Sequence, residues 1–184
     1  MTFHINNSKV NLSEEIIGHG DFKYRVEVGW GDLDPKKYPV NNCHEMVMDK
    51  KGRLIMLTDH AKNNVLIYDK SGGLLHSWTL NLPGAHGLTI HEEGGAEFLY
   101  ITDPSLGRVI KTNLDGRVLL EIASPTKIGA YDVHAPFKPT ETAIGPNGNI
   151  YVADGYGSQY ILQYDPKGNF IRKFGGDGFL SPEK

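Results

Sequence analysis

The chain has 184 residues, 39% of them hydrophobic and 22% charged, and a net charge of −3, which is the composition of an ordinary soluble globular protein. It contains no apolar run that could cross a membrane and no basic stretch typical of nucleic-acid binding, and its single cysteine, Cys43, excludes an internal disulfide and a cysteine-rich zinc site. We therefore expect neither a membrane nor a nucleic acid as partner. No signal peptide is visible at the start, so the cytoplasm is the default location.

The first 38 residues form an irregular arm in this interpretation. Residues 23–31, KYRVEVGWG, resemble the stretch 170–176 near the other end of the chain. We expect one strand near residues 22–30 and little other regular structure in the arm.

Three stretches of equal length then repeat one pattern, starting at His44, His86 and Thr140. Each contains four short apolar segments separated by polar turns, and the second segment of each is followed by an aspartate. Such segments, rich in Ile, Val, Leu and Tyr, predict strands joined by tight turns, and the 22 glycines and 10 prolines support many turns. The predicted strands are 46–48, 54–57, 65–68 and 74–78, then 88–90, 98–101, 109–112 and 118–122, then 142–144, 150–153, 160–164 and 170–174.

A four-stranded antiparallel unit repeated every ~40 to 50 residues is typical of a β-propeller blade. The sequence therefore predicts an all-β fold with little helix, in which residues 39–184 form a partial propeller. Its three blades are expected near residues 40–80, 84–122 and 138–176. A β-sandwich is the competing interpretation, but the recurring aspartate argues against it.

Propellers commonly close their ring with an N-terminal strand, and the strand expected within residues 1–38 suits that role. Three blades leave two outer faces uncovered, which favours a truncated product of a longer gene. Two copies pairing as half-rings, and a tight four-bladed ring that uses the arm, are the alternatives.

The repeat resembles the NHL family of β-propellers, most closely in residues 150–175, IYVADGYGSQYILQYDPKGNFIRKFG. Residues 80–176 are more specifically similar to the propeller of peptidyl-α-hydroxyglycine α-amidating lyase and its bacterial relatives. The matching motifs are Pro83-Gly84-Ala85-His86-Gly87-Leu88, Pro139-Thr140-Glu141 and Ala153-Asp154-Gly155-Tyr156. This resemblance implies half of a six-bladed ring, a central zinc held by histidines, and a structural calcium on the ring axis.

His86 opens the innermost strand of the second unit, where imidazole could bind zinc. The matching histidine of the lyases is a zinc ligand. His44 lies at the same place in the first unit, so adjacent blades could aim two imidazoles at one metal, although His44 has no counterpart among the ligands of the lyases. The resemblance also implies that the Leu88 carbonyl faces the calcium and that Tyr156 is the catalytic base. Zinc needs three or four protein ligands, and the family's other histidines would fall beyond Lys184.

The long connection 123–139 carries Tyr131 and His134, which could contact a substrate. The aspartates Asp59, Asp103 and Asp154 are expected to accept hydrogen bonds from turn amides. The substrate-binding arginine of the lyases aligns with Asp59, which departs from the family pattern. The sequence thus favours a metal-dependent carbon–nitrogen lyase with a small peptide-like substrate. The alternative is a propeller without catalysis that binds a peptide, a sugar or a protein.

Overall fold

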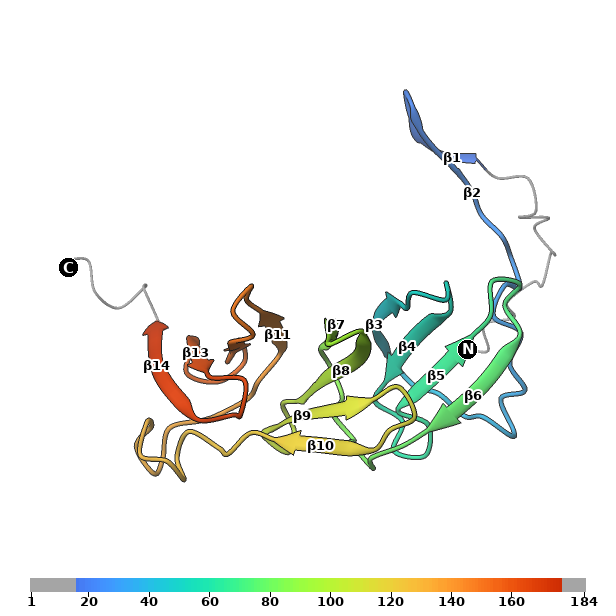
Figure 1. Ribbon diagram of the computed structural model, residues 1–184. Helices are drawn as coiled ribbons and strands as arrows, with labels where there is room; N and C mark the ends of the chain where they lie inside the picture. The colour runs from blue at the N-terminus through green and yellow to red at the C-terminus, as the bar shows by residue number, and fades with distance from the viewer. Residues whose placement is uncertain (1–15, 177–184) are drawn as a thin grey trace, which may run out of the picture.

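The computed structural model describes residues 16–176, and all the regular structure within them is β-strand. Fourteen strands form three four-stranded antiparallel sheets and one two-stranded hairpin. Figure 1 shows the three sheets side by side, with the innermost strands β3, β7 and β11 on one side of the array and the outermost strands on the other. Within residues 16–176 there is no helix that could cross a membrane. The predicted all-β fold of propeller blades is confirmed.

Each blade is a meander in which consecutive strands pair along the sheet. Blade 1 consists of β3 (Cys43–Met48), β4 (Leu54–Thr58), β5 (Val65–Tyr68) and β6 (Leu74–Trp78). Blade 2 consists of β7 (Leu88–Glu93), β8 (Ala96–Asp103), β9 (Arg108–Asn113) and β10 (Val118–Glu121). Blade 3 consists of β11 (Glu141–Ile144), β12 (Ile150–Ala153), β13 (Tyr160–Tyr164) and β14 (Phe170–Gly175). The three blades thus span residues 43–78, 88–121 and 141–175.

The turns between strands repeat one local design. The carboxylate of Asp49 accepts the amides two and four residues further on, at 3.0 and 2.8 Å, and Gly52 completes the turn at φ +73°. Asp165 accepts the corresponding amides at 2.8 and 2.9 Å, with Gly168 at φ +83°. An aspartate that satisfies turn amides, followed by a glycine in the left-handed region, explains why Asp-x-x-Gly recurs between the apolar segments.

The core of the protein lies between the blades. Ile55, Leu57, Val65 and Ile67 of blade 1 meet Leu99, Ile101 and Ile110 of blade 2, and all are at most 2% exposed. The second interface joins Tyr100 and Val109 of blade 2 to Ile150, Val152, Leu162 and Tyr164 of blade 3. Burying each such side chain contributes roughly 1.5–3 kcal/mol, so the blades hold one another in place.

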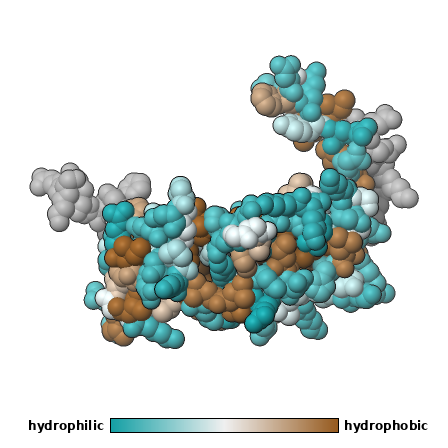
Figure 2. All heavy atoms as spheres, viewed as in Figure 1, coloured by the Kyte–Doolittle hydropathy of each residue, from teal (hydrophilic) through white to brown (hydrophobic). Residues whose placement is uncertain are grey.

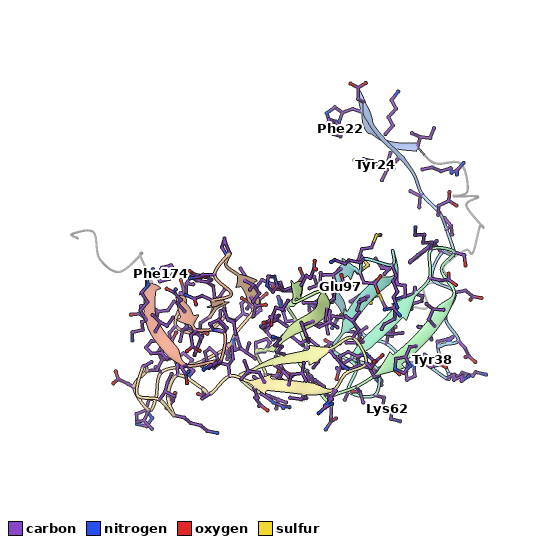
Figure 3. All side chains as sticks on the ribbon, in the orientation of Figure 1. Phe22, Tyr24, Tyr38, Lys62, Glu97 and Phe174 are labelled. Carbon is purple, nitrogen blue, oxygen red and sulfur yellow. The ribbon has the colours of Figure 1, made fainter. Side chains whose placement is uncertain are left out.

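Within residues 16–176, each of the two end blades has one face without a neighbouring blade. On blade 1 this face carries Met46 and Met48, which are 58% and 62% exposed, and residues 30–40 cover part of it, with the Trp30 ring 5.8 Å from that of Tyr68. Hydrophobic atoms also reach the surface at the other end of the array, over blade 3 (Figure 2), where β14 carries the exposed Phe174 (Figure 3).

The segment before blade 1 forms a separate hairpin of β1 (Ile16–His19) and β2 (Phe22–Arg25). It projects from the blades, and the side chains of Phe22 and Tyr24 are 71% and 61% exposed (Figures 1 and 3). Strand β2 covers the first part of the strand predicted near residues 22–30, but it pairs with β1 and not with a blade. The ring-closing role assigned to this strand stays a prediction.

Candidate functional site

The innermost strands of the three blades lie next to one another. A site residue lies at the start of each strand or just before it. His44 lies in β3, His86 lies just before β7, and Thr140 lies just before β11. Strand β7 contacts both β3 and β11, which brings the three starts together (Figure 1). The equal position of these residues in the repeat therefore becomes proximity in space.

His86 is held by a hydrogen bond to the neighbouring blade. Its Nδ1 lies 3.1 Å from the carbonyl oxygen of Thr140. A carbonyl oxygen only accepts, so Nδ1 carries a proton, and in the neutral imidazole Nε2 then keeps its lone pair. That lone pair faces the hydroxyl of Tyr156, 3.1 Å away, and the phenol is the donor in this bond. The arrangement fixes the tautomer of His86 and aims one nitrogen at the exposed side chain of Tyr156.

Gly87 explains how the two blades come this close. A Cβ at this position would collide with the Thr140 carbonyl oxygen and lie 2.9 Å from the Cα of Glu141. Only glycine lets the start of β7 approach the start of β11 so closely. The glycine is therefore required by the packing that orients His86.

His44 lies against His86 from the other side. Their rings are stacked with centroids 4.7 Å apart, and the Nε2 of His44 is 3.6 Å from a carboxylate oxygen of Asp59. Asn42 donates its backbone and side-chain amides to the same carboxylate, at 3.1 and 2.8 Å. Partial burial raises the pKa of Asp59, but the Asn42 hydrogen bonds and the nearby His44 outweigh it, so the pKa lies below its ordinary value.

These side chains line one cleft of about 650 Å³ at the end of the blades where β4 and β8 terminate. His86 and Tyr156 lie on its wall together with a single lysine, Lys138. The complete lining is Asn42, His44, Asp59, Pro83, Gly84, His86, Pro104, Ser105, Lys138 and Tyr156. A cleft with imidazoles, a phenol and an ammonium group can hold a small anionic molecule and move a proton on it.

The inner edges of the blades carry two carboxylates beside Leu88. Glu45 accepts the backbone amide of Leu88 at 2.8 Å, and because the N–H and C=O of a strand residue point to the same edge, the Leu88 carbonyl lies on this edge too. Glu141 accepts the Thr89 hydroxyl at 3.0 Å. Burial and the neighbouring Glu45 raise the pKa of Glu141 to about 7. Carboxylate and carbonyl oxygens are the donors that suit calcium.

The two residues expected on the connection 123–139 do not line this cleft. Tyr131 is only 5% exposed, packs in the interface between blades 2 and 3, and donates its hydroxyl to Asp154 at 2.9 Å. His134 is exposed on the connection. The three aspartates accept backbone amides as expected: Asp59 from Asn42, Asp103 from Gly84 and Leu106, and Asp154 from Lys138 and Ser158.

The described residues fit part of a zinc site. His86 has the geometry of a ligand, because metal-binding histidines commonly donate their other ring nitrogen to a carbonyl or carboxylate. His44 adds a second imidazole beside it. No group of three histidine, cysteine, aspartate or glutamate side chains suited to a metal lies within residues 16–176. These residues thus supply an oriented ligand and a neighbour, but not a complete zinc site.

Sequence reasoning missed four residues of the site: Asn42, Glu45, Lys138 and Glu141. Glu141 belongs to the motif Pro139-Thr140-Glu141, which resembles the lyases, and Lys138 comes directly before this motif. No local pattern marked either one, since their importance comes from contacts between blades.

Comparison with known proteins adds sequence similarity to this geometry. No family model matches the chain. It is 36% identical over 92 residues to peptidyl-glycine alpha-amidating monooxygenase B of Xenopus laevis, covering 49% of this chain and 10% of that protein. It is 34% identical over 86 residues to a probable peptidyl-alpha-hydroxyglycine alpha-amidating lyase of Caenorhabditis elegans, covering 47% of this chain and 24% of that protein. The chain thus spans a quarter or less of the length of these relatives.

Among solved structures, a catalytically inactive virginiamycin B lyase from Staphylococcus aureus with quinupristin matches with a TM-score of 0.58. The identity is 15%, and the match covers 78% of this chain and 45% of that one. This likeness shows the fold alone. Together the comparisons show that the chain is built of β-propeller blades and resembles the amidating lyases in sequence over about half its length.

Proposed function

We propose that this protein is a carbon–nitrogen lyase that cleaves a peptidyl-α-hydroxyglycine into a peptide amide and glyoxylate. The observation that carries the proposal is the pair of His86 and Tyr156, whose Nε2 and hydroxyl lie 3.1 Å apart on the wall of the cleft. The similarity to the amidating lyases over about half of the chain supports the choice of substrate.

The reaction needs a proton moved from one substrate atom to another. The substrate carries a hydroxyl and an amide nitrogen on one carbon. When the hydroxyl loses its proton, its oxygen forms the carbonyl of glyoxylate, the C–N bond breaks with its electron pair going to nitrogen, and nitrogen takes up a proton. No oxidant or water enters the balance. One positioned proton carrier beside the hydroxyl therefore suffices.

In this proposal Tyr156 is the carrier. A phenol in water has a pKa near 10, so a phenol alone is a weak base at neutral pH. The unprotonated Nε2 of His86 accepts the phenol proton in a hydrogen bond, which increases the electron density on the phenol oxygen. Tyr156 can then take the substrate's hydroxyl proton while its own proton moves to Nε2 of His86, and the two transfers reverse when the leaving nitrogen is protonated.

The proposal includes zinc at His86 and His44 and calcium at the Leu88 carbonyl. Zinc, when bound, supplies Lewis-acid chemistry that lowers the pKa of a hydroxyl. The Nε2 of His86, kept unprotonated by the Thr140 carbonyl, would be the ligand atom. It would then no longer accept the Tyr156 proton, and the cation would take over the role of favouring the ionised phenol. The carboxylates of Glu45 and Glu141 support the calcium proposal, because they lie on the same inner edge as Leu88.

The test is glyoxylate release from α-hydroxyhippurate by the protein expressed at the natural length of its gene, with zinc added. His86→Ala should abolish both zinc retention and turnover. Tyr156→Phe should keep the zinc and slow turnover by ~100-fold, the low end for a lost general acid–base group. Full activity in Tyr156→Phe would remove the phenol from the mechanism, and no glyoxylate from the unmodified protein would overturn the lyase proposal.

A propeller that binds without catalysis is the second candidate. The partly covered apolar face with the exposed Met46 and Met48 favours an interaction role for the blades. In that case His86→Ala and Tyr156→Phe would leave the binding of the partner unchanged, and the purified protein would carry no stoichiometric zinc.

A further inference from the structure

The charged side chains of the cleft differ in whether they already have partners. Its one carboxylate, Asp59, already accepts two hydrogen bonds from Asn42 and lies beside His44. Its one permanent cation, Lys138, is exposed and has neither a hydrogen-bond partner for its ammonium group nor a carboxylate within 4.0 Å among residues 16–176. By contrast, Arg108 and Lys111 of blade 2 are paired with glutamates. The cleft therefore offers an incoming molecule one available positive charge.

The backbone of Lys138 is anchored to the loop that carries Tyr156. The Lys138 amide donates to Asp154 at 2.6 Å, and its carbonyl accepts the amide of Tyr156 at 3.4 Å. Asp154 is fully buried, so this anchor does not move freely. The backbones of Lys138 and Tyr156 are thus held in fixed positions relative to each other, while the lysine side chain is free to reach a ligand.

Lys138 also lies where the cleft joins a second groove of about 680 Å³. The two share Pro104, Ser105 and Lys138. The groove continues over Leu106, Ile122 and Phe137, with hydroxyl groups from Ser124 and Thr126, so its lining suits an extended, partly apolar molecule. Its arginine, Arg108, is occupied by two hydrogen bonds to Glu121, at 2.8 and 2.9 Å. The groove also has Lys127, whose charge acts on the same Glu121. Neither Arg108 nor Lys127 lines the cleft, so a carboxylate beside Tyr156 and His86 would meet Lys138.

We propose that Lys138 binds the carboxylate on the reacting carbon of the substrate, with the rest of the peptide lying in the adjoining groove. This inference rests on the proposed function, since the α-hydroxyglycine end of that substrate is a carboxylate beside a hydroxyl. With the carboxylate on Lys138, the hydroxyl one carbon away faces Tyr156 and His86. Lys138 is therefore a specificity residue that selects substrates ending in a free carboxylate.

The test compares two ligands that cannot be cleaved because they lack the hydroxyl. Benzoylglycine has the carboxylate, and its amide, benzoylglycinamide, is neutral. Calorimetric titration of the unmodified protein should show tighter binding of benzoylglycine. Lys138→Met should reduce that preference by about 10-fold, as expected for the loss of one charge-assisted hydrogen bond. Lys138→Arg should retain most of it.

Lys167→Met is the matched control. Lys167 is an exposed lysine of the β13–β14 turn, at the end of blade 3 opposite to the start of β11. Its loss should leave the preference unchanged. An equal preference in Lys138→Met and the unmodified protein would overturn the assignment of Lys138, even if glyoxylate is still released. If the preference depends on Lys138 but the protein releases no glyoxylate, the proposal that Lys138 binds a carboxylate stands and the lyase proposal is wrong.

Discussion

Asp59 of blade 1 and Asp154 of blade 3 follow the second strand of their blades, yet their surroundings differ. Asp154 is fully buried and accepts the Tyr131 hydroxyl at 2.9 Å and the Lys138 and Ser158 amides at 2.6 and 2.7 Å. Asp59 is partly exposed, is bonded to Asn42 alone, and faces the imidazole of His44 across 3.6 Å.

The difference comes from the segments that reach each aspartate. The long connection 123–139 brings Tyr131 and Lys138 to Asp154 and closes it off from the cleft. Only the short stretch before β3 reaches Asp59, so its carboxylate stays at the cleft wall. The aspartate at this position of the repeat thus anchors the long connection in blade 3, whereas in blade 1 it lies beside the imidazole of His44.

Asp154→Ala should have the largest effect on stability. It leaves a buried phenol and two backbone amides without an acceptor, and breaking a buried network of this kind costs about 3 kcal/mol. Urea-induced unfolding would measure the change. Asp154→Asn, which keeps one acceptor oxygen, should lose less. A loss below about 1 kcal/mol for the alanine variant would contradict the difference drawn between the two aspartates.

Tyr131→Phe removes one of the donors to Asp154 and keeps the ring. The ring packs 6.3 Å from Phe137 and 5.7 Å from Tyr160, so the packing should survive. We expect a loss of about 1.5 kcal/mol, the value for one hydrogen bond to a charged group. The same variant tests the substrate-binding role predicted for Tyr131: turnover below the unfolding transition should be unchanged if the hydroxyl acts only on Asp154.

Asp59→Ala should destabilise the fold by only about 1 kcal/mol, because water can replace the partners of a partly exposed carboxylate. Its main effect should be on the cleft, since His44 loses its carboxylate neighbour. Urea-induced unfolding of Asp59→Ala and Asp154→Ala under the same conditions compares the two losses of stability directly. Equal losses in the two variants would show that the repeat position, and not its surroundings, decides the stability contribution.

The smallest expected effect is a dependence on acid pH. The folded pKa of Asp59 lies below its ordinary value, so the folded state binds this proton less readily than the unfolded state. The resulting stabilisation is complete above the unfolded pKa, about 4, and is lost as the pH falls through the folded pKa. The advantage of the unmodified protein over Asp59→Asn in urea unfolding should therefore be present at about pH 5 and shrink below about pH 4. An advantage that grows in acid would reverse the sign assigned to Asp59.

Much of the site could be located from the sequence because the repeat carries it. Equal positions in equal units place His44 and His86 at neighbouring inner strands, and the structure brings their rings to 4.7 Å. The loop after β12 carries Tyr156 to the same cleft. The burial of Tyr131 was not visible in the sequence, because an exposed loop and one folded into an interface between blades have similar composition.

The sequence by itself determined the strands of the three blades and the turns between them. These depend on neighbouring residues, such as an aspartate two and four residues before the amides that it accepts, or a glycine where the backbone must take a positive φ. Only the tertiary structure decided the tautomer of His86, the partner of Glu141 and the isolation of Lys138. Each of these depends on atoms of another blade or of a distant loop, whose approach is set by how closely the faces of the blades pack.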